Sequence, residues 1–61
     1  MTIKTFSKLV NAKYGDSAVV RKGYWSQGRR IGNGDGVSID LPTGAQLYFV
    51  KIDIAAKELK V

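Results

Sequence analysis

The chain of 61 residues contains no cysteine and no histidine. Without cysteine, no disulfide can cross-link the fold and no thiolate can bind a metal or attack a substrate. Without histidine, the chain lacks the commonest zinc ligand and the commonest general base. We therefore expect a protein that is not an enzyme, with no catalytic residues, no metal site and no cofactor.

Long apolar runs are also missing. No stretch approaches the roughly 20 apolar residues that span a bilayer, and Lys4, Lys8 and Lys13 interrupt the one segment placed like a signal peptide. Valine, isoleucine, leucine and phenylalanine nevertheless make up 17 of the 61 residues, which is too many for a disordered chain. The composition predicts a single small domain over residues 1–61, cytoplasmic and with no membrane partner.

Positive charge exceeds negative charge, and the excess lies in the first half of the chain. The formal net charge is +5, from ten Lys and Arg against five Asp and Glu. Residues 1–30 hold seven of the ten basic side chains and a single acid, Asp16. This asymmetry favours a basic working surface in the first half and a scaffold in the second. The alternative is that the charge only keeps a small protein soluble.

The first element is expected to be an amphipathic helix from Ile3 to Tyr14. Thr2 is a good N-cap, and Gly15 suits a C-terminal cap that needs positive φ. A helical period gathers the apolar side chains of one stripe, which are Ile3, Phe6, Val10 and Tyr14. The opposite face carries Lys4, Lys8 and Asn11, which are either solvated or available to phosphate groups.

Residues rich in β-branched and aromatic side chains predict strands in the rest of the chain. A strand over 17–25 is expected to return over 29–31 through a turn at 26–28. A strand over 37–41 is expected to pair with one over 47–54, while 55–61 fit either a helical turn or an edge strand. The glycine-rich stretch 32–36 is typical of a hairpin turn and lacks the motifs of phosphate and calcium loops.

The expected fold class is α+β, with one N-terminal amphipathic helix packed on a three- to four-stranded antiparallel sheet. Alternation over 47–54 places Leu47 and Phe49 on the face away from the helix. Apolar side chains there favour a second covering layer, most simply a second copy of the chain in a homodimer. The alternative is that both side chains are half exposed.

The most specific feature is a basic and aromatic segment within ten residues. It comprises Arg21, Lys22, Tyr24, Trp25, Arg29 and Arg30. Cations neutralise phosphates, aromatic rings stack on bases, and a two-stranded ribbon can enter a groove of DNA. These six residues are the candidate nucleic-acid-binding site, with DNA favoured over RNA. Two alternatives stay open: Tyr24 and Trp25 belong to the core beside a solvated basic rim, or the segment binds a protein.

Residues 14–50 resemble the AbrB/MazE class of bacterial DNA-binding domains. The stretch YGDSAVVR at 14–21 looks like the family's aromatic-Gly-Asn-Ser opening that leads to an arginine, and IGNGDGVSIDL at 31–41 looks like its Gly-Asp-x-Val strand. The resemblance implies an intertwined homodimer that binds DNA, with Arg21 as the residue carried over. The chain departs from the family in having Lys22-Gly23 where the family has Ile-Pro, and in its N-terminal helix.

The sequence as a whole favours a small basic DNA-binding protein of transcription regulation, of phage or bacterial type, that uses the basic and aromatic hairpin. The alternative is a protein-binding module, such as a small inhibitor or an accessory subunit that docks on a larger protein. Its anchors would be Trp25, Leu47 and Phe49, because large apolar and aromatic side chains dominate protein interfaces.

Overall fold

Within residues 1–26, 28–31 and 36–61, which the computed structural model describes, the chain forms two helices, a three-stranded sheet and a two-stranded ribbon. The elements in chain order are α1 (Ile3–Tyr14), β1 (Val19–Lys22), β2 (Trp25–Ser26), β3 (Arg29–Arg30), β4 (Val37–Asp40), β5 (Gln46–Phe49) and α2 (Ile52–Leu59). The expected α+β class, with an N-terminal helix on an antiparallel sheet, is confirmed.

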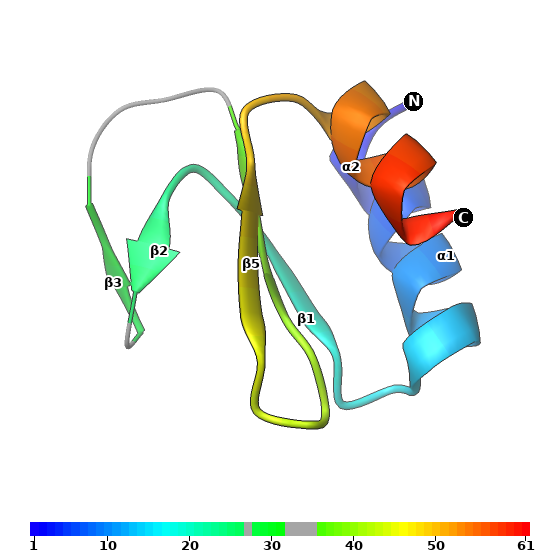
Figure 1. The fold of residues 1–61 in the computed structure, drawn as a ribbon, viewed down its shortest axis with the longest axis horizontal. Coiled ribbons are helices and arrows are strands. Elements are labelled where there is room, and N and C mark those ends of the chain that lie inside the picture. The colour runs from blue at the N-terminus through cyan, green and yellow to red at the C-terminus, as the bar shows by residue number, and fades with distance from the viewer. Residues whose placement is uncertain (27, 32–35) are drawn as a thin grey trace.

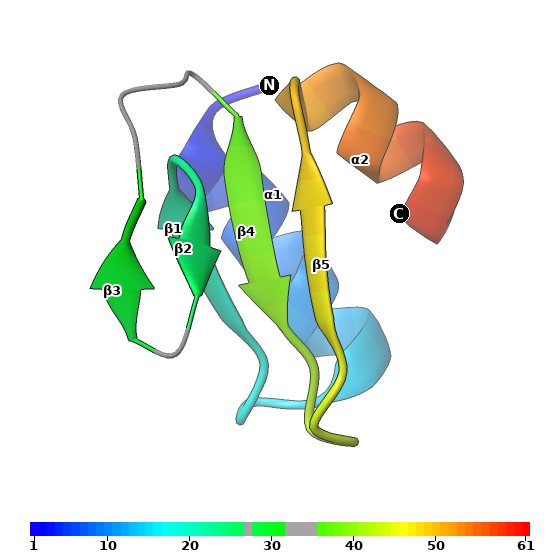
Figure 2. The same cartoon turned by 60° about the vertical axis from the view of Figure 1, so that its left-hand side comes forward.

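The elements are arranged in three layers (Figure 1). The sheet has the strand order β1-β4-β5 with antiparallel pairing, and both helices cover one of its faces. The ribbon, which is the hairpin of β2 and β3, lies on the side of the sheet away from the helices (Figure 2). Neither helix of the described ranges has the length and apolar character to cross a membrane.

The first helix begins and ends where the sequence predicts. The Thr2 hydroxyl accepts a hydrogen bond from a backbone N–H of the first turn at 3.1 Å and so caps the N-terminus. Gly15 closes the other end with φ +114°, and its N–H donates to the Asn11 carbonyl at 2.9 Å. Phe6 and Val10 of the expected apolar stripe are fully buried.

The core lies between the sheet and the helices. The strand register places Ile39 between Val20 and Leu47, and Val37 opposite Phe49. The buried apolar residues are Phe6, Val10, Ala18, Val37, Ile39, Ala55 and Leu59. Leu47 and Phe49 pack against this cluster, so the prediction that they lie on the face away from the helix is wrong. Helix α2 contributes to their cover, and these two side chains no longer argue for a second copy of the chain.

The second helix corrects the expected strand over 47–54. The strand ends at Phe49, and a helix runs from Ile52 to Leu59. Ile52, Ala55, Ala56 and Leu59 follow the helical spacing i, i+3, i+4 and i+7, and all of them contact the core. Ile52 also continues the two-residue period of the strand before it, which is why alternation alone extends the strand too far. For 55–61, the helical option is the one observed.

The expected strand over 17–25 is interrupted at Gly23. β1 pairs with β4 and not with 29–31, and Val20 lies opposite Ile39. Gly23, with φ +97°, turns the backbone out of the sheet, so that only Trp25 and Ser26 pair with β3. The expected turn at 26–28 includes residue 27, and the expected turn at 32–36 includes residues 32–35. These residues lie outside the described ones.

Gly36 lies just before β4, close to Tyr48. A Cβ at this position would overlap the carbonyl oxygen of Phe49 and lie 2.5 Å from the hydroxyl of Tyr48. We expect Gly36→Ala to lower the free energy of unfolding by about 2–3 kcal/mol, because backbone and ring must move apart. Urea denaturation measures this loss.

Gly28→Ala is the matched control for this prediction. Gly28 has φ +77°, which strains an alanine, but no atom of the described residues lies within 4 Å of its Cβ position. We expect a loss of about 1 kcal/mol from backbone strain alone. Equal losses in the two variants would contradict the close packing at Gly36.

Candidate nucleic-acid interface

The ribbon displays two of the predicted basic residues. Trp25 pairs with Arg30, and Ser26 pairs with Arg29. Opposed residues of a ribbon point to the same side and neighbours along a strand point to opposite sides. Arg30 therefore shares a side with Trp25, and Arg29 lies on the other side. Both arginines are exposed, so the ribbon carries positive charge on each of its faces.

A buried hydroxyl fastens the ribbon to the sheet. Ser38 lies in the central strand β4 and is only 2% exposed. Its Oγ accepts a hydrogen bond from the Trp25 backbone N–H at 2.8 Å and donates one to the Gly23 carbonyl at 2.7 Å. The Gly23 N–H in turn donates to the Gly36 carbonyl at 2.7 Å. The path of the chain out of β1 is thus set by hydrogen bonds to the sheet.

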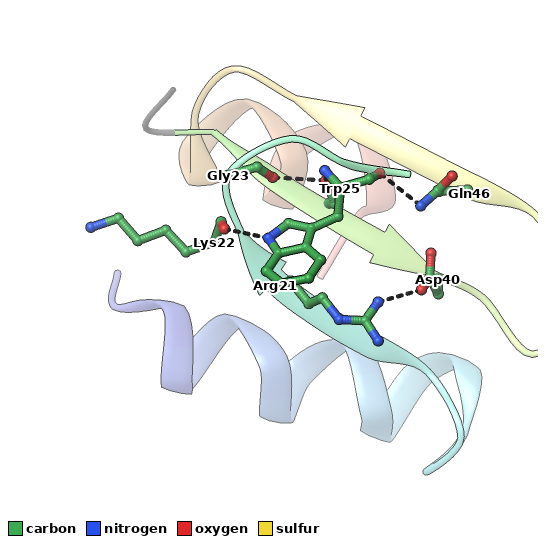
Figure 3. Close-up of polar contacts among 7 residues, drawn as sticks. Arg21, Lys22, Gly23, Trp25, Asp40 and Gln46 are labelled. Carbon is green, nitrogen blue, oxygen red and sulfur yellow. Dashed lines mark hydrogen bonds and ion pairs between the residues drawn. The ribbon is translucent and has the colours of Figure 1, made fainter. Parts of the chain in front are cut away.

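Two further hydrogen bonds hold Trp25 (Figure 3). Gln46 on β5 donates from Nε2 to the Trp25 carbonyl at 2.8 Å, and the indole Nε1 of Trp25 donates to the Lys22 carbonyl at 2.8 Å. Trp25 is half-buried and lies outside the cluster between sheet and helices. The tryptophan therefore belongs to the attachment of the ribbon and not to the helix-side core.

Arg21 packs against the indole and is paired with a carboxylate. Its Nη1 lies 2.6 Å from Asp40 Oδ2, and its guanidinium carbon lies 5.3 Å from the centre of the Trp25 ring (Figure 3). Since both side chains of the ion pair are about one-third exposed, at 33% and 37%, the pair contributes at most about 1 kcal/mol. These contacts hold Arg21 in place, so it helps to position the ribbon.

Tyr24 sits where the chain enters the ribbon, and its ring lies against another aromatic ring. The ring centres of Tyr24 and Tyr48 are 4.8 Å apart, with an angle of 42° between the ring planes. Tyr24 remains 44% exposed. One part of the ring is therefore engaged with the sheet, and the rest is available to a ligand.

Arg30 lies along the backbone where β1 leaves the sheet. A Cβ at Gly23 would come within 2.8 Å of Arg30 Nε, so the glycine leaves the space that this side chain occupies. Arg29 is exposed, whereas Lys22 lies opposite the core residue Val37 and so on the helix face of the sheet. The acids Asp53 and Glu58 lie on α2, across the sheet from the ribbon. Among the described residues, the ribbon itself carries two exposed arginines, and the carboxylate of Asp40 beneath it is engaged by Arg21.

Five of the six predicted site residues divide into two groups. Arg21 and Trp25 are engaged in contacts that attach the ribbon to the sheet. Tyr24, Arg29 and Arg30 are exposed on the ribbon or directly before it. Lys22 belongs to neither group, because it is exposed at the end of β1 on the helix face of the sheet. Arg29 and Arg30 do not rise beside Arg21 on one long hairpin, because β1 pairs with β4.

Three residues that attach the ribbon are not among the six predicted site residues. They are Ser38, Asp40 and Gln46, and they come from β4 and β5. Alternation over 37–41 is a signal for two of them, since it turns Ser38 and Asp40 away from the core. Alternation does not predict that Ser38 is buried, because its burial is due to the ribbon that covers it. Leu47 and Phe49 pack against the core, which removes two of the three anchors of the protein-binding alternative.

Comparisons of the chain with protein-family models, with curated protein sequences and with solved structures find no match. The candidate interface is therefore defined by its own geometry, and the resemblance to the AbrB/MazE class stays a prediction.

The hydroxyl of Ser38 offers a direct test of how the ribbon is held. Ser38→Ala leaves the Trp25 N–H and the Gly23 carbonyl without a partner. We expect the free energy of unfolding to fall by about 2–3 kcal/mol, the cost of unsatisfied buried groups. We also expect faster hydrogen exchange at the Trp25 amide. Urea unfolding followed by Trp25 fluorescence, together with amide exchange, measures both effects.

Ser17→Ala is the control, because Ser17 is exposed and lies outside the ribbon. A surface substitution of this kind changes stability by no more than about 0.5 kcal/mol. Unchanged exchange at Trp25 in Ser38→Ala would show that the hydroxyl does not fasten the ribbon.

Proposed function

We propose that this protein binds duplex DNA through the ribbon and acts as a small regulatory DNA-binding protein. The observation that carries the proposal is the pair of exposed arginines on β3, displayed on a two-stranded ribbon that projects from the sheet (Figure 2). A two-stranded ribbon fits the width of the major groove. Arginine is the side chain best suited to the edges of guanine and to phosphate oxygens.

The distribution of charge supports the same surface. Arg29 and Arg30 are exposed on the ribbon. The carboxylate of Asp40 is already paired with Arg21. An exposed basic surface attracts the phosphate backbone and raises the rate of association with DNA.

The aromatic rings favour a duplex over a single strand. Binding of single strands depends on bases that stack on free aromatic faces. The ring of Trp25 lies against Arg21 and is held through its Nε1, and the ring of Tyr24 lies against Tyr48. Both rings are thus engaged within the protein, whereas the two arginines of β3 are exposed residues. Arg21, the residue implied by the family resemblance, positions the ribbon in this proposal.

Removal of the two β3 arginines tests the proposal. We expect the double variant Arg29→Ala with Arg30→Ala to bind a mixed-sequence duplex much more weakly at low salt. The slope of log K against log salt should become shallower by about 2, since each lost phosphate contact accounts for about 0.9. Fluorescence anisotropy of a labelled duplex, titrated at several salt concentrations, measures both quantities.

A second double variant removes the same charge elsewhere. Lys51 and Lys57 are exposed, Lys51 just before α2 and Lys57 within it. Lys51→Ala with Lys57→Ala should leave the salt slope unchanged within about 0.5, because neither residue lies on the ribbon. If both double variants lose affinity equally, attraction is a property of net charge and the ribbon is not the binding surface. Absence of binding by the unaltered protein at low salt would reject the proposal.

A further inference from the structure

At one edge of the sheet, side chains cap two outward carbonyls, that of Ala18 just before β1 and that of Lys22 at its end. Residues of an antiparallel strand turn their backbone groups alternately toward and away from the neighbouring strand. Because Gly23 faces β4, the carbonyls of Ala18 and Lys22 point outward. Asn11 donates from Nδ2 to the Ala18 carbonyl at 2.8 Å, and the indole of Trp25 donates to the Lys22 carbonyl at 2.8 Å. These contacts obstruct the two ends of the β1 edge to pairing with another strand.

At the other edge, β5 has no such protection. The Leu41 N–H donates to the Ala45 carbonyl at 2.8 Å, so the alternation turns the backbone groups of Gln46 and Tyr48 away from β4. Among the described residues, no hydrogen bond reaches these outward groups. The strand also contains neither a charged residue nor a proline, which are the usual devices that block an edge. Figure 1 looks onto this edge and shows no described element in front of it.

We propose that the β5 edge is an interface at which two copies of the chain pair antiparallel around a twofold axis normal to the sheet. With Leu47 opposite Leu47 of the second copy, Gln46 of each chain lies opposite Tyr48 of the other. This register gives the outward N–H and C=O groups of both residues partners at once. The result is a continuous six-stranded antiparallel sheet.

The occupant that fits this edge is a second copy of the chain. Each chain carries a net charge of +5, but β5 contains only uncharged side chains, so an identical strand opposes no like charges across the interface. Val50, directly after β5, is 60% exposed, and Ile54 in the first turns of α2 is 43% exposed. A second copy beside β5 reduces the exposure of these apolar side chains.

The mass of the full chain in solution tests the interface. We expect sedimentation equilibrium to give the mass of two chains in the upper part of a series from about 10 µM to 1 mM. A mass of one chain throughout this range would overturn the proposal, even if the same edge bound an extended peptide of another protein.

Two matched substitutions locate the interface. Val50→Lys places a positive charge beside the open edge, and we expect it to raise the dimer dissociation constant at least about tenfold. Val19→Lys is the control, since Val19 is 40% exposed on β1 at the opposite edge. Its dissociation constant should stay within about twofold of the unaltered chain. Equal weakening in both variants, or weakening by Val19→Lys alone, would overturn the assignment to β5.

Backbone methylation separates edge pairing from side-chain effects. A chain of 61 residues is within reach of chemical synthesis, which permits N-methylation of a single peptide bond. N-methylation of Tyr48 removes an outward N–H of β5 and should abolish the dimer while the circular dichroism spectrum of the monomer is retained. N-methylation of Val20 alters the outward edge of β1 and should leave the dimer intact. A dimer that survives N-methylation of Tyr48 would overturn the proposal.

Discussion

The position of the ribbon depends on the hydrogen bonds of one buried hydroxyl. Ser38 lies at the middle of the sheet, where a polar side chain is tolerated only if its hydrogen bonds are satisfied. The chain satisfies them with the Gly23 carbonyl and the Trp25 N–H, which are the groups freed when β1 ends. The chain therefore leaves the sheet for the ribbon at the point where its backbone groups supply the hydrogen bonds of the buried Ser38 hydroxyl. The ring contacts of Trp25 and the Arg21–Asp40 pair then reinforce this geometry from exposed positions.

The two sides of the sheet are stabilised by different interactions. On the helix side, a small apolar cluster centred on Phe6, Val10 and Ile39 supplies most of the stabilisation through burial. On the ribbon side, stability comes from a few polar contacts, and the exposed arginines of β3 take part in none of the ion pairs found among the described residues. Loss of the β3 side chains should thus affect binding with little effect on folding, whereas loss of the groups beneath the ribbon should affect both.

Local pattern predicts much of this fold. The capped helix over Ile3–Tyr14, the pairing of β4 with β5 and the inward side chains of 37–41 all follow from short-range periods and turn residues. The prediction of a strand over 47–54 is too long because Ile52 fits both the strand period and the helix period. Only packing on the core decides between the two. The strand predicted over 17–25 ends early because Gly23 turns the chain out of the sheet, where its carbonyl accepts a hydrogen bond from Ser38 Oγ. Such contacts join residues distant in sequence, and no local pattern encodes them.

The edge pairing and the ribbon are compatible with each other. A twofold axis normal to the sheet leaves the helices of both copies on one side and both ribbons on the other. The ribbon contacts β5 through the side chains of Gln46 and Tyr48, and the outward backbone groups that join the copies are not used in these contacts. A dimer of this kind would present two ribbons to one face of a duplex, which is how symmetric DNA-binding proteins contact paired half-sites.

The most direct test of the account is a map of the DNA contact surface by ¹⁵N–¹H correlation spectra, recorded during titration with a short duplex at low salt. The account predicts that the largest shifts fall on Tyr24, Arg29 and Arg30, while the amides of α1 and α2 stay in place. Largest shifts on the exposed face of α1, at Lys4 and Lys8, or no shifts at all, would contradict it.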